Sequence, residues 1–176
     1  MFKKALIATD FSASSFSVVK NPAPLLALGV EECLVLQCLN FVQTETAGLY
    51  YTYAVLEENL KNQVEYLHRA GIRAESRIVP GFARSEVNRI AEEEDCDLIC
   101  AGVQTSSLVN EAIVGDIGYE ILHGCRKPLL LLRLGKGKSG AEEPSPIQEN
   151  LLKHVLYPTD FSQTANAAFD VVYTLV

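Results

Sequence analysis

Short apolar runs and longer amphipathic stretches alternate along most of the chain. Leu56, Leu60, Val64 and Leu67 recur at spacings of three and four residues, which predicts a helix with one apolar face. The short runs show no regular polar alternation, which is typical of strands that are buried on both faces of a parallel sheet. The predicted strands are Ala5–Thr9, Cys33–Leu39, Ala74–Val79, Leu98–Ala101 and Leu129–Leu134.

The order of these elements, β-α-β-α-β-α-β-α-β, predicts an α/β fold with a doubly wound parallel sheet. The first helix is predicted at Ser14–Leu28, and it contains Pro22 and Pro24. Because proline lacks an amide hydrogen and clashes with the preceding turn, we expect this helix to be kinked or split there. Further helices are predicted around Val87–Ala91 and Ile113–Ile121.

The composition changes after this pattern ends. Residues 1–134 form the predicted α/β domain, whereas residues 135–150 are rich in Gly, Ser, Pro, Glu and Lys. Such a composition is typical of a linker that does not fold. Residues 151–176 then begin with a new apolar, strand-like run at Val155–Pro158.

An internal repeat explains this last segment. The sequence Thr-Asp-Phe-Ser at residues 9–12 recurs at 159–162, in both cases between an apolar run and a helix start. Residues 151–176 therefore read as the first strand and helix of a second, incomplete copy of the domain. A single strand and helix cannot bury their own apolar faces. We expect the segment to pack on the first domain, to exchange between chains, or to belong to a longer protein, and we favour the last.

Charge and cysteine usage narrow the function. The formal net charge is -7 and no basic patch stands out, so no nucleic-acid partner is expected. No signal peptide or membrane-spanning run is recognised, which predicts a cytoplasmic protein without a membrane partner. The cysteines form no C-x-x-C pair and are expected to be reduced, mostly buried thiols without a metal. These residues are Cys33, Cys38, Cys96, Cys100 and Cys125.

Several motifs together identify a family. They are Thr9–Ser12 at the end of the first strand, Ile90–Ile99 leading into the fourth, Gly102 with Gly115, and Lys127–Leu132 as the last strand. In this order and spacing the chain resembles the universal stress protein family over Met1–Leu134, and again from Leu151.

The resemblance implies a five-stranded parallel sheet in the order 3-2-1-4-5. This is the three-layer α/β/α arrangement of adenine nucleotide alpha hydrolase-like and flavodoxin-like folds. It also implies a small stress-response protein, often a dimer and commonly in tandem-repeat form. Some family members bind ATP or AMP and others bind neither.

The candidate nucleotide site lies at the tips of the first and fourth strands. In an open parallel sheet, ligands bind at the carboxyl ends of the strands where the strand order reverses. The candidate contacts at these tips are Ala8, Thr9, Asp10, Gly102 and Val103.

Asp10 has two readings. Its carboxylate can accept hydrogen bonds from a ligand's hydroxyl or amino groups, or it can cap the following helix, a role that Ser12 or Ser14 could share. Both readings stay open. The resemblance adds the backbone of Cys38, which aligns with a position that meets adenine in nucleotide-binding members.

The loop after the fourth strand departs from the family pattern. ATP-binding members carry Gly-x2-Gly-x9-Gly-Ser/Thr, whose glycines let the backbone approach phosphates. Gly102 and Gly115 match, but Thr105 replaces the second glycine and Asp116 replaces the Ser/Thr. The Asp116 carboxylate would repel a phosphate, at a cost of about 1 kcal/mol at 4 Å in water and more in a cleft. We therefore expect a degraded site that binds AMP more readily than ATP.

The last strand, Leu129–Leu134, is flat and apolar and is expected at the sheet edge, where unpaired backbone invites pairing. The resemblance implies that it pairs with its counterpart, either in a homodimer or in an intramolecular pseudo-dimer.

The chain shows no catalytic triad, no H-E-x-x-H and no P-loop lysine, so no enzyme is predicted. The predicted function is a stress-response binding module. A nucleotide-free structural dimerisation adaptor is the alternative, and a slow ATP hydrolase is disfavoured.

Overall fold

The computed structural model describes residues 2–39, 46–104, 121–122, 124–136, 142–144 and 152–175 of the chain. Its strands are β1 (Lys4–Thr9), β2 (Glu32–Leu39), β3 (Arg73–Pro80), β4 (Leu98–Gln104), β5 (Leu129–Lys136) and β6 (Glu142–Pro144). Its helices are α1 (Ala13–Lys20), α2 (Ala23–Ala27), α3 (Thr46–Arg69), α4 (Ala83–Glu93) and α6 (Gln163–Leu175).

The sheet has the predicted parallel core. β3, β2, β1, β4 and β5 are neighbours in that order and all pair in parallel, which confirms the α/β fold class and the order 3-2-1-4-5. A sixth strand, β6, was not predicted, because its composition is typical of a linker. It pairs antiparallel with Leu134–Lys136 and so satisfies backbone groups at the end of the β5 edge.

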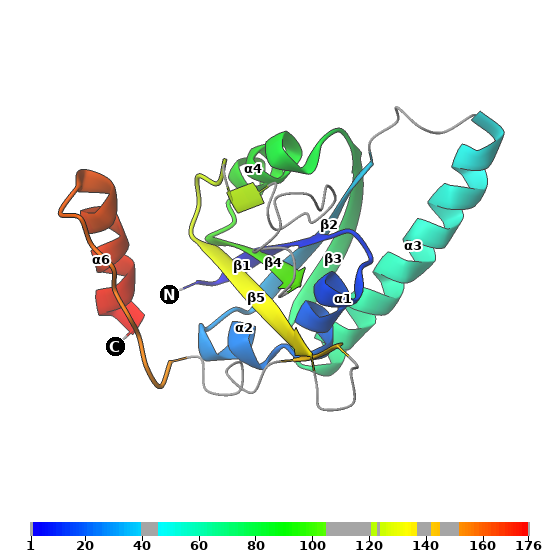
Figure 1. Cartoon of the computed structure of the whole chain (residues 1–176). Coiled ribbons are helices and arrows are strands. Elements are labelled where there is room, and N and C mark those ends of the chain that lie inside the picture. The colour runs from blue at the N-terminus through cyan, green and yellow to red at the C-terminus, as the bar shows by residue number, and fades with distance from the viewer. Residues whose placement is uncertain are drawn as a thin grey trace.

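Helices cover the sheet on both faces, which makes three layers (Figure 1). One hydrophobic cluster joins Ile7 of β1 and Val35 of β2 to side chains of α1, α2 and α3. The other joins the neighbouring strand residues Leu6 and Leu34 to α4 and to Ile121. Because successive strand residues point to opposite faces, continuously apolar strands supply both clusters at once.

The first predicted helix is split at its prolines, as expected. α1 ends at Lys20, and α2 begins two residues beyond Asn21 with Pro22 as its N-cap and Pro24 in its first turn. Proline is tolerated there because those amide groups have no partner within the helix. Of the helix predicted around Ile113–Ile121, only the last residue lies within the described part of the chain.

Of the predicted second copy, the described residues form the helix but not the strand. α6 forms, but the predicted strand Val155–Pro158 is not a strand in the structure, because no described strand pairs with it. Leu156 is 89% exposed, whereas its counterpart Leu6 is fully buried. Leu152, Val171 and Leu175 nevertheless pack against the α1/α3-side cluster of the first domain. The division into a domain, a linker and a second copy remains a prediction.

A carboxylate after α4 joins two strands of the sheet. Glu94 accepts hydrogen bonds from Arg77 Nη2 at 2.7 Å and from Lys4 Nζ at 3.1 Å. The Arg77 hydrogen bond, followed by the one from Lys4, lowers the pKa of Glu94 below its ordinary value. A carboxyl group whose pKa is lowered on folding stabilises the native state above its unfolded pKa, and this stabilisation is lost as the pH falls through the folded value.

We predict that Glu94→Gln lowers the unfolding temperature at pH 7, because the two cationic partners lose their carboxylate. The same substitution makes the decline of stability below the ordinary glutamate pKa of 4.5 less steep. Thermal unfolding followed by circular dichroism between pH 3 and pH 8 measures both effects. Glu58→Gln, on the exposed surface of α3, is the matched control. If both variants show the same pH profile, Glu94 does not stabilise the fold through its charge.

Candidate functional site

The register of the parallel strands brings the predicted contact residues to one edge of the sheet. Ala8 lies opposite Ala101 of β4, and Thr9 lies opposite Gln37 of β2. The structure therefore gathers these predicted residues at the strand tips: Ala8, Thr9, Asp10, Cys38, Gly102 and Val103. The remaining predicted contacts, Thr105, Gly115 and Asp116, lie outside the described residues.

A tight turn connects β1 to α1. Phe11 adopts a left-handed conformation with φ of 61°, which is uncommon for a residue with a side chain. Its amide donates to Thr9 Oγ1 at 3.3 Å, and Asp10 Oδ1 accepts from the Ser12 amide at 2.9 Å. The Ser15 hydroxyl also donates to Asp10 Oδ1. These bonds compensate for the unfavourable φ and close the turn locally.

The helix cap and the turn use different side chains. Ser12 Oγ accepts from the Ser15 amide at 3.3 Å, so Ser12 is the N-cap of α1. Asp10 uses only Oδ1 to brace the turn, and its Oδ2 accepts no hydrogen bond from the described residues. Asp10 is half-buried at the strand tip, so that oxygen is available to a ligand. The helix cap is therefore Ser12 and not Asp10, whereas the ligand contact of Asp10 stays a prediction.

The second copy reproduces this turn. Phe161 also has φ of 61°, and Asp160 Oδ1 accepts from the Ser162 amide at 2.9 Å. Ser162 Oγ caps α6 by accepting from the Ala165 amide at 3.1 Å. The repeat seen in the sequence is thus a repeat of geometry. It differs in one donor, because Ala165 stands where the first copy has Ser15.

Gly102 packs directly against the backbone of Ser14 and Ser15. A Cβ atom at this position would lie 2.1 Å from the carbonyl oxygen of Ser14 and 2.8 Å from the amide nitrogen of Ser15. The first turn of α1 therefore packs directly on the tip of β4. This glycine makes room for the backbone of α1. Its predicted approach to phosphates stays a prediction.

Two buried glutamines beside Thr9 were not predicted as part of the site. Gln37 is 8% exposed and Gln63 is fully buried, and Gln63 Nε2 donates to Thr9 Oγ1 at 3.3 Å. The sequence carried a signal for both. Gln37 interrupts an otherwise apolar strand, and Gln63 lies next to Leu60 and Val64 on the apolar stripe of its helix. A polar residue at a core position requires a hydrogen-bond partner.

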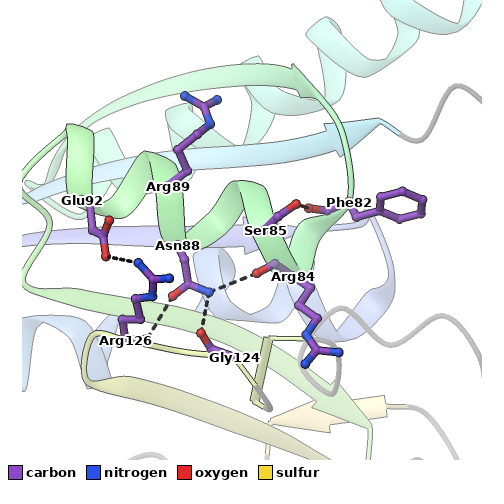
Figure 2. Close-up of a pocket in the computed structure, with 8 residues that line it drawn as sticks. All are labelled: Phe82, Arg84, Ser85, Asn88, Arg89, Glu92, Gly124 and Arg126. Atoms are coloured by element: carbon purple, nitrogen blue, oxygen red, sulfur yellow. Dashed lines mark hydrogen bonds and ion pairs between the residues drawn. The ribbon is translucent and has the colours of Figure 1, made fainter.

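A separate groove of about 600 Å³ lies between α4 and the turn before β5 (Figure 2). Asn88 organises this groove. Its Nδ2 donates to the Gly124 carbonyl at 2.8 Å, and its Oδ1 accepts from the Arg126 amide at 3.0 Å. None of the predicted contact residues lines it.

The arginines of this groove are mostly neutralised. Arg126 pairs with Glu92 at 3.3 Å, and Arg89 pairs with two glutamates of its own helix. Within the described part of the chain, only Arg84 among the lining arginines makes no ion pair. The groove therefore offers little net charge to an anion, and we place the candidate site at the strand tips instead.

The buried thiols do not supply a nucleophile. Burial raises the pKa of Cys33 to about 12, and it also raises the pKa of Cys100. A thiol reacts as its thiolate, so both groups are unreactive at neutral pH.

No cluster of three or more His, Cys, Asp or Glu able to hold a metal ion occurs among the described residues. None of the described helices is long and apolar enough to cross a membrane.

The strand order reverses between β1 and β4, and the polar side chains at this edge of the sheet lie where α/β proteins with open parallel sheets bind small ligands. The sequence profile of the Universal stress protein family matches residues 1–133, and the chain belongs to this family. Universal stress protein MJ0577 of Methanocaldococcus jannaschii is 24% identical over 155 residues, which cover 76% of this chain and 96% of that protein.

Solved structures share the fold. The structure of MJ0577 matches with a TM-score of 0.61 and 23% identity, over 78% of this chain and 99% of that chain. A universal stress protein from Archaeoglobus fulgidus matches with a TM-score of 0.78 and 24% identity, over 98% of this chain and 62% of that chain. This chain thus spans about three fifths of the second protein.

Some of the similar structures hold ligands. One is a universal stress protein in complex with cAMP, with a TM-score of 0.56 and 19% identity over 75% of this chain and 97% of that chain. Another is a universal stress protein from Archaeoglobus fulgidus in complex with dAMP, with a TM-score of 0.53 and 17% identity over 74% of this chain and 97% of that chain.

We predict that Gly102→Ala destabilises the protein by about 1–3 kcal/mol or more, because the new methyl group would overlap the Ser14 carbonyl. Urea unfolding followed by circular dichroism measures the change. Gly124→Ala is the matched control, since a Cβ there would meet its nearest atom, Arg84 Cγ, at an ordinary 3.5 Å. Equal stability of the two variants would contradict the close packing of α1 on β4.

Proposed function

We propose that this protein is a regulatory binding module that takes up an adenine nucleotide at the tips of β1 and β4. One observation carries the proposal. Asp10 lies where the strand order reverses, with one carboxylate oxygen bracing the turn and the other without a partner among the described residues. The cAMP and dAMP complexes of similar folds support an adenine nucleotide as the ligand.

A monophosphate suits this site better than a triphosphate. Thr105 and Asp116 replace residues that cradle phosphates in ATP-binding members of the family. A carboxylate at the position of Asp116 adds a like charge where further phosphates would lie, and this cost grows with the charge of the ligand. AMP is therefore the proposed ligand. The proposed role is binding and regulation in the cytoplasm.

A second candidate function is a nucleotide-free dimerisation adaptor. The packing of Ser14 on Gly102 favours it, because this glycine is explained without any ligand. Only part of the β5 edge is open to pairing with a second copy of the domain. β6 occupies the edge at Leu134–Lys136, so the remaining edge of β5, Leu129–Arg133, has no described strand beside it. A homodimer or an intramolecular pseudo-dimer would have to use this shorter edge.

We predict that Asp10→Ala weakens AMP binding by about tenfold or more, because a charge-assisted hydrogen bond to the ligand is lost. Isothermal titration calorimetry with AMP measures the affinity. Asp160→Ala is the matched control, since it removes the same residue from the same turn in the second copy.

Two outcomes would contradict the proposal. If wild-type protein binds no AMP, and the purified protein carries no adenine nucleotide by mass spectrometry, the adaptor function is favoured. If Asp10→Ala and Asp160→Ala reduce the affinity equally, the ligand does not bind at the tip of β1.

We also predict that Asp116→Ser tightens ATP binding more than AMP binding, because the substitution removes a negative charge from the phosphate end of the site. Competition of ATP and AMP for the same site gives the ratio of their affinities. Asp170→Ser, on the exposed side of α6, changes the net charge equally and controls for long-range effects. Sub-micromolar ATP affinity in the unsubstituted protein would show that Asp116 does not repel the triphosphate.

A further inference from the structure

The edge of the sheet formed by β3 has no described strand beside it. β3 lies at one end of the strand order and pairs only with β2 among the described strands. The edge of a strand carries amide and carbonyl groups that a second extended chain can pair with, which is how several kinds of domain bind peptides. None of the candidate nucleotide contacts belongs to β3, so this edge is a separate surface of the protein.

Hydrogen bonds at the start of β3 show which of its residues direct their backbone groups outward. The Arg73 amide donates to the carbonyl of Glu31, immediately before β2, at 3.0 Å. Because backbone direction alternates along a parallel strand, the odd-numbered residues of β3 face β2 and the even-numbered residues face outward. The His68 ring of α3 agrees with this assignment, since it donates to the outward carbonyl of Ala74 at 3.0 Å.

A groove of about 380 Å³ lies between this edge and α3. Its lining residues are Ser76, Arg77 and Ile78 from β3, and Tyr53, Glu57 and Leu60 from α3. The outward amide and carbonyl groups of Ser76 and Ile78 make no hydrogen bond to any other described segment. An extended peptide in the groove can therefore pair with both residues without displacing a contact of the fold.

The groove carries one charge that the described residues leave without an ion pair. Arg77 is neutralised by Glu94, with 2.7 Å between Arg77 Nη2 and the carboxylate. Glu57 is exposed and forms no ion pair with a described residue. Tyr53, 43% exposed, precedes Glu57 by four residues on α3, so the ring and the carboxylate share one face of the helix. A guanidinium group can pair with a carboxylate and stack on an aromatic ring at once.

We propose that the β3 edge binds an extended, arginine-containing peptide segment of a partner protein, which adds to the sheet as a further strand. The peptide backbone pairs with Ser76 and Ile78. Because side chains alternate along a strand, every second peptide side chain faces α3, and an arginine at one of these positions meets Glu57 and Tyr53. An acidic segment is disfavoured, since it would bring a second carboxylate up to Glu57.

The test uses short peptides with the full chain. An acetylated and amidated peptide of sequence Thr-Arg-Val-Arg-Thr is compared with Thr-Glu-Val-Glu-Thr by isothermal titration calorimetry. The arginine peptide should bind at least about tenfold more tightly, because a charge-assisted hydrogen bond is lost in the glutamate peptide. Glu57→Gln should weaken binding of the arginine peptide by about fivefold or more. Glu58→Gln, also exposed on α3 but outside the groove, is the matched control and should leave the affinity unchanged.

Two further measurements test strand addition itself. N-methylation of alternate amides in the arginine peptide keeps its charge but prevents backbone pairing, and it should abolish binding. Amide hydrogen exchange followed by NMR should show slower exchange at Ser76 and Ile78 when the unmethylated peptide binds.

The contrary outcomes are equally specific. No binding of the arginine peptide, or equal affinity for the two peptides, overturns the proposal. Unchanged exchange at Ser76 and Ile78 on binding, or full affinity of the N-methylated peptide, shows that no strand is added to β3. If the two amides are protected without peptide, and increasingly so at higher protein concentration, the edge takes a second copy of this chain and the assignment to a partner peptide is wrong.

Discussion

The contact between the first turn of α1 and the tip of β4 determines the geometry of the candidate site. Ser14 places its carbonyl where a side chain of residue 102 would begin, so only glycine allows this approach. The contact draws the turn after β1 against β4 at the point where the strand order reverses. Asp10 is thereby held beside the β4 tip. The backbone of the first α1 turn is already in place at this edge of the sheet, where ligands of open parallel sheets bind.

The turn after β1 is built almost entirely from its own residues. Its left-handed Phe11 and its hydrogen bonds to Thr9 and Asp10 recur at residues 159–162, where no strand of the described residues pairs beside the turn. Local side-chain bonds to the backbone are thus sufficient to set this conformation. What the first copy adds is tertiary: Ser15 gives Asp10 a second donor, and Gln63 holds Thr9 from across the core.

The residues around the candidate site differ in how well the sequence predicts them. Asp10 and Gly102 stand in recognisable motifs at strand ends, and their adjacency follows from the strand order. Gln37 and Gln63 stand in no motif. Gln37 lies on β2 beside Thr9, whereas Gln63 lies on α3 and reaches Thr9 only because of how α3 packs. Gly102 shows a related limit of the sequence, because a glycine indicates that space is needed but does not show that the backbone of α1 fills part of it.

The sequence by itself determined the alternation of buried strands and amphipathic helices, the split of the first helix at its prolines, and the repeated turn. These features depend on residues close together in the chain, whose patterns and local hydrogen bonds can be read directly. Only the tertiary structure decided that β6 covers part of the β5 edge, that Val155–Pro158 has no strand partner among the described residues, and that Gln63 of α3 reaches Thr9. Strand pairing and buried polar contacts join residues distant in sequence, and their geometry exists only once the sheet and its helices are assembled.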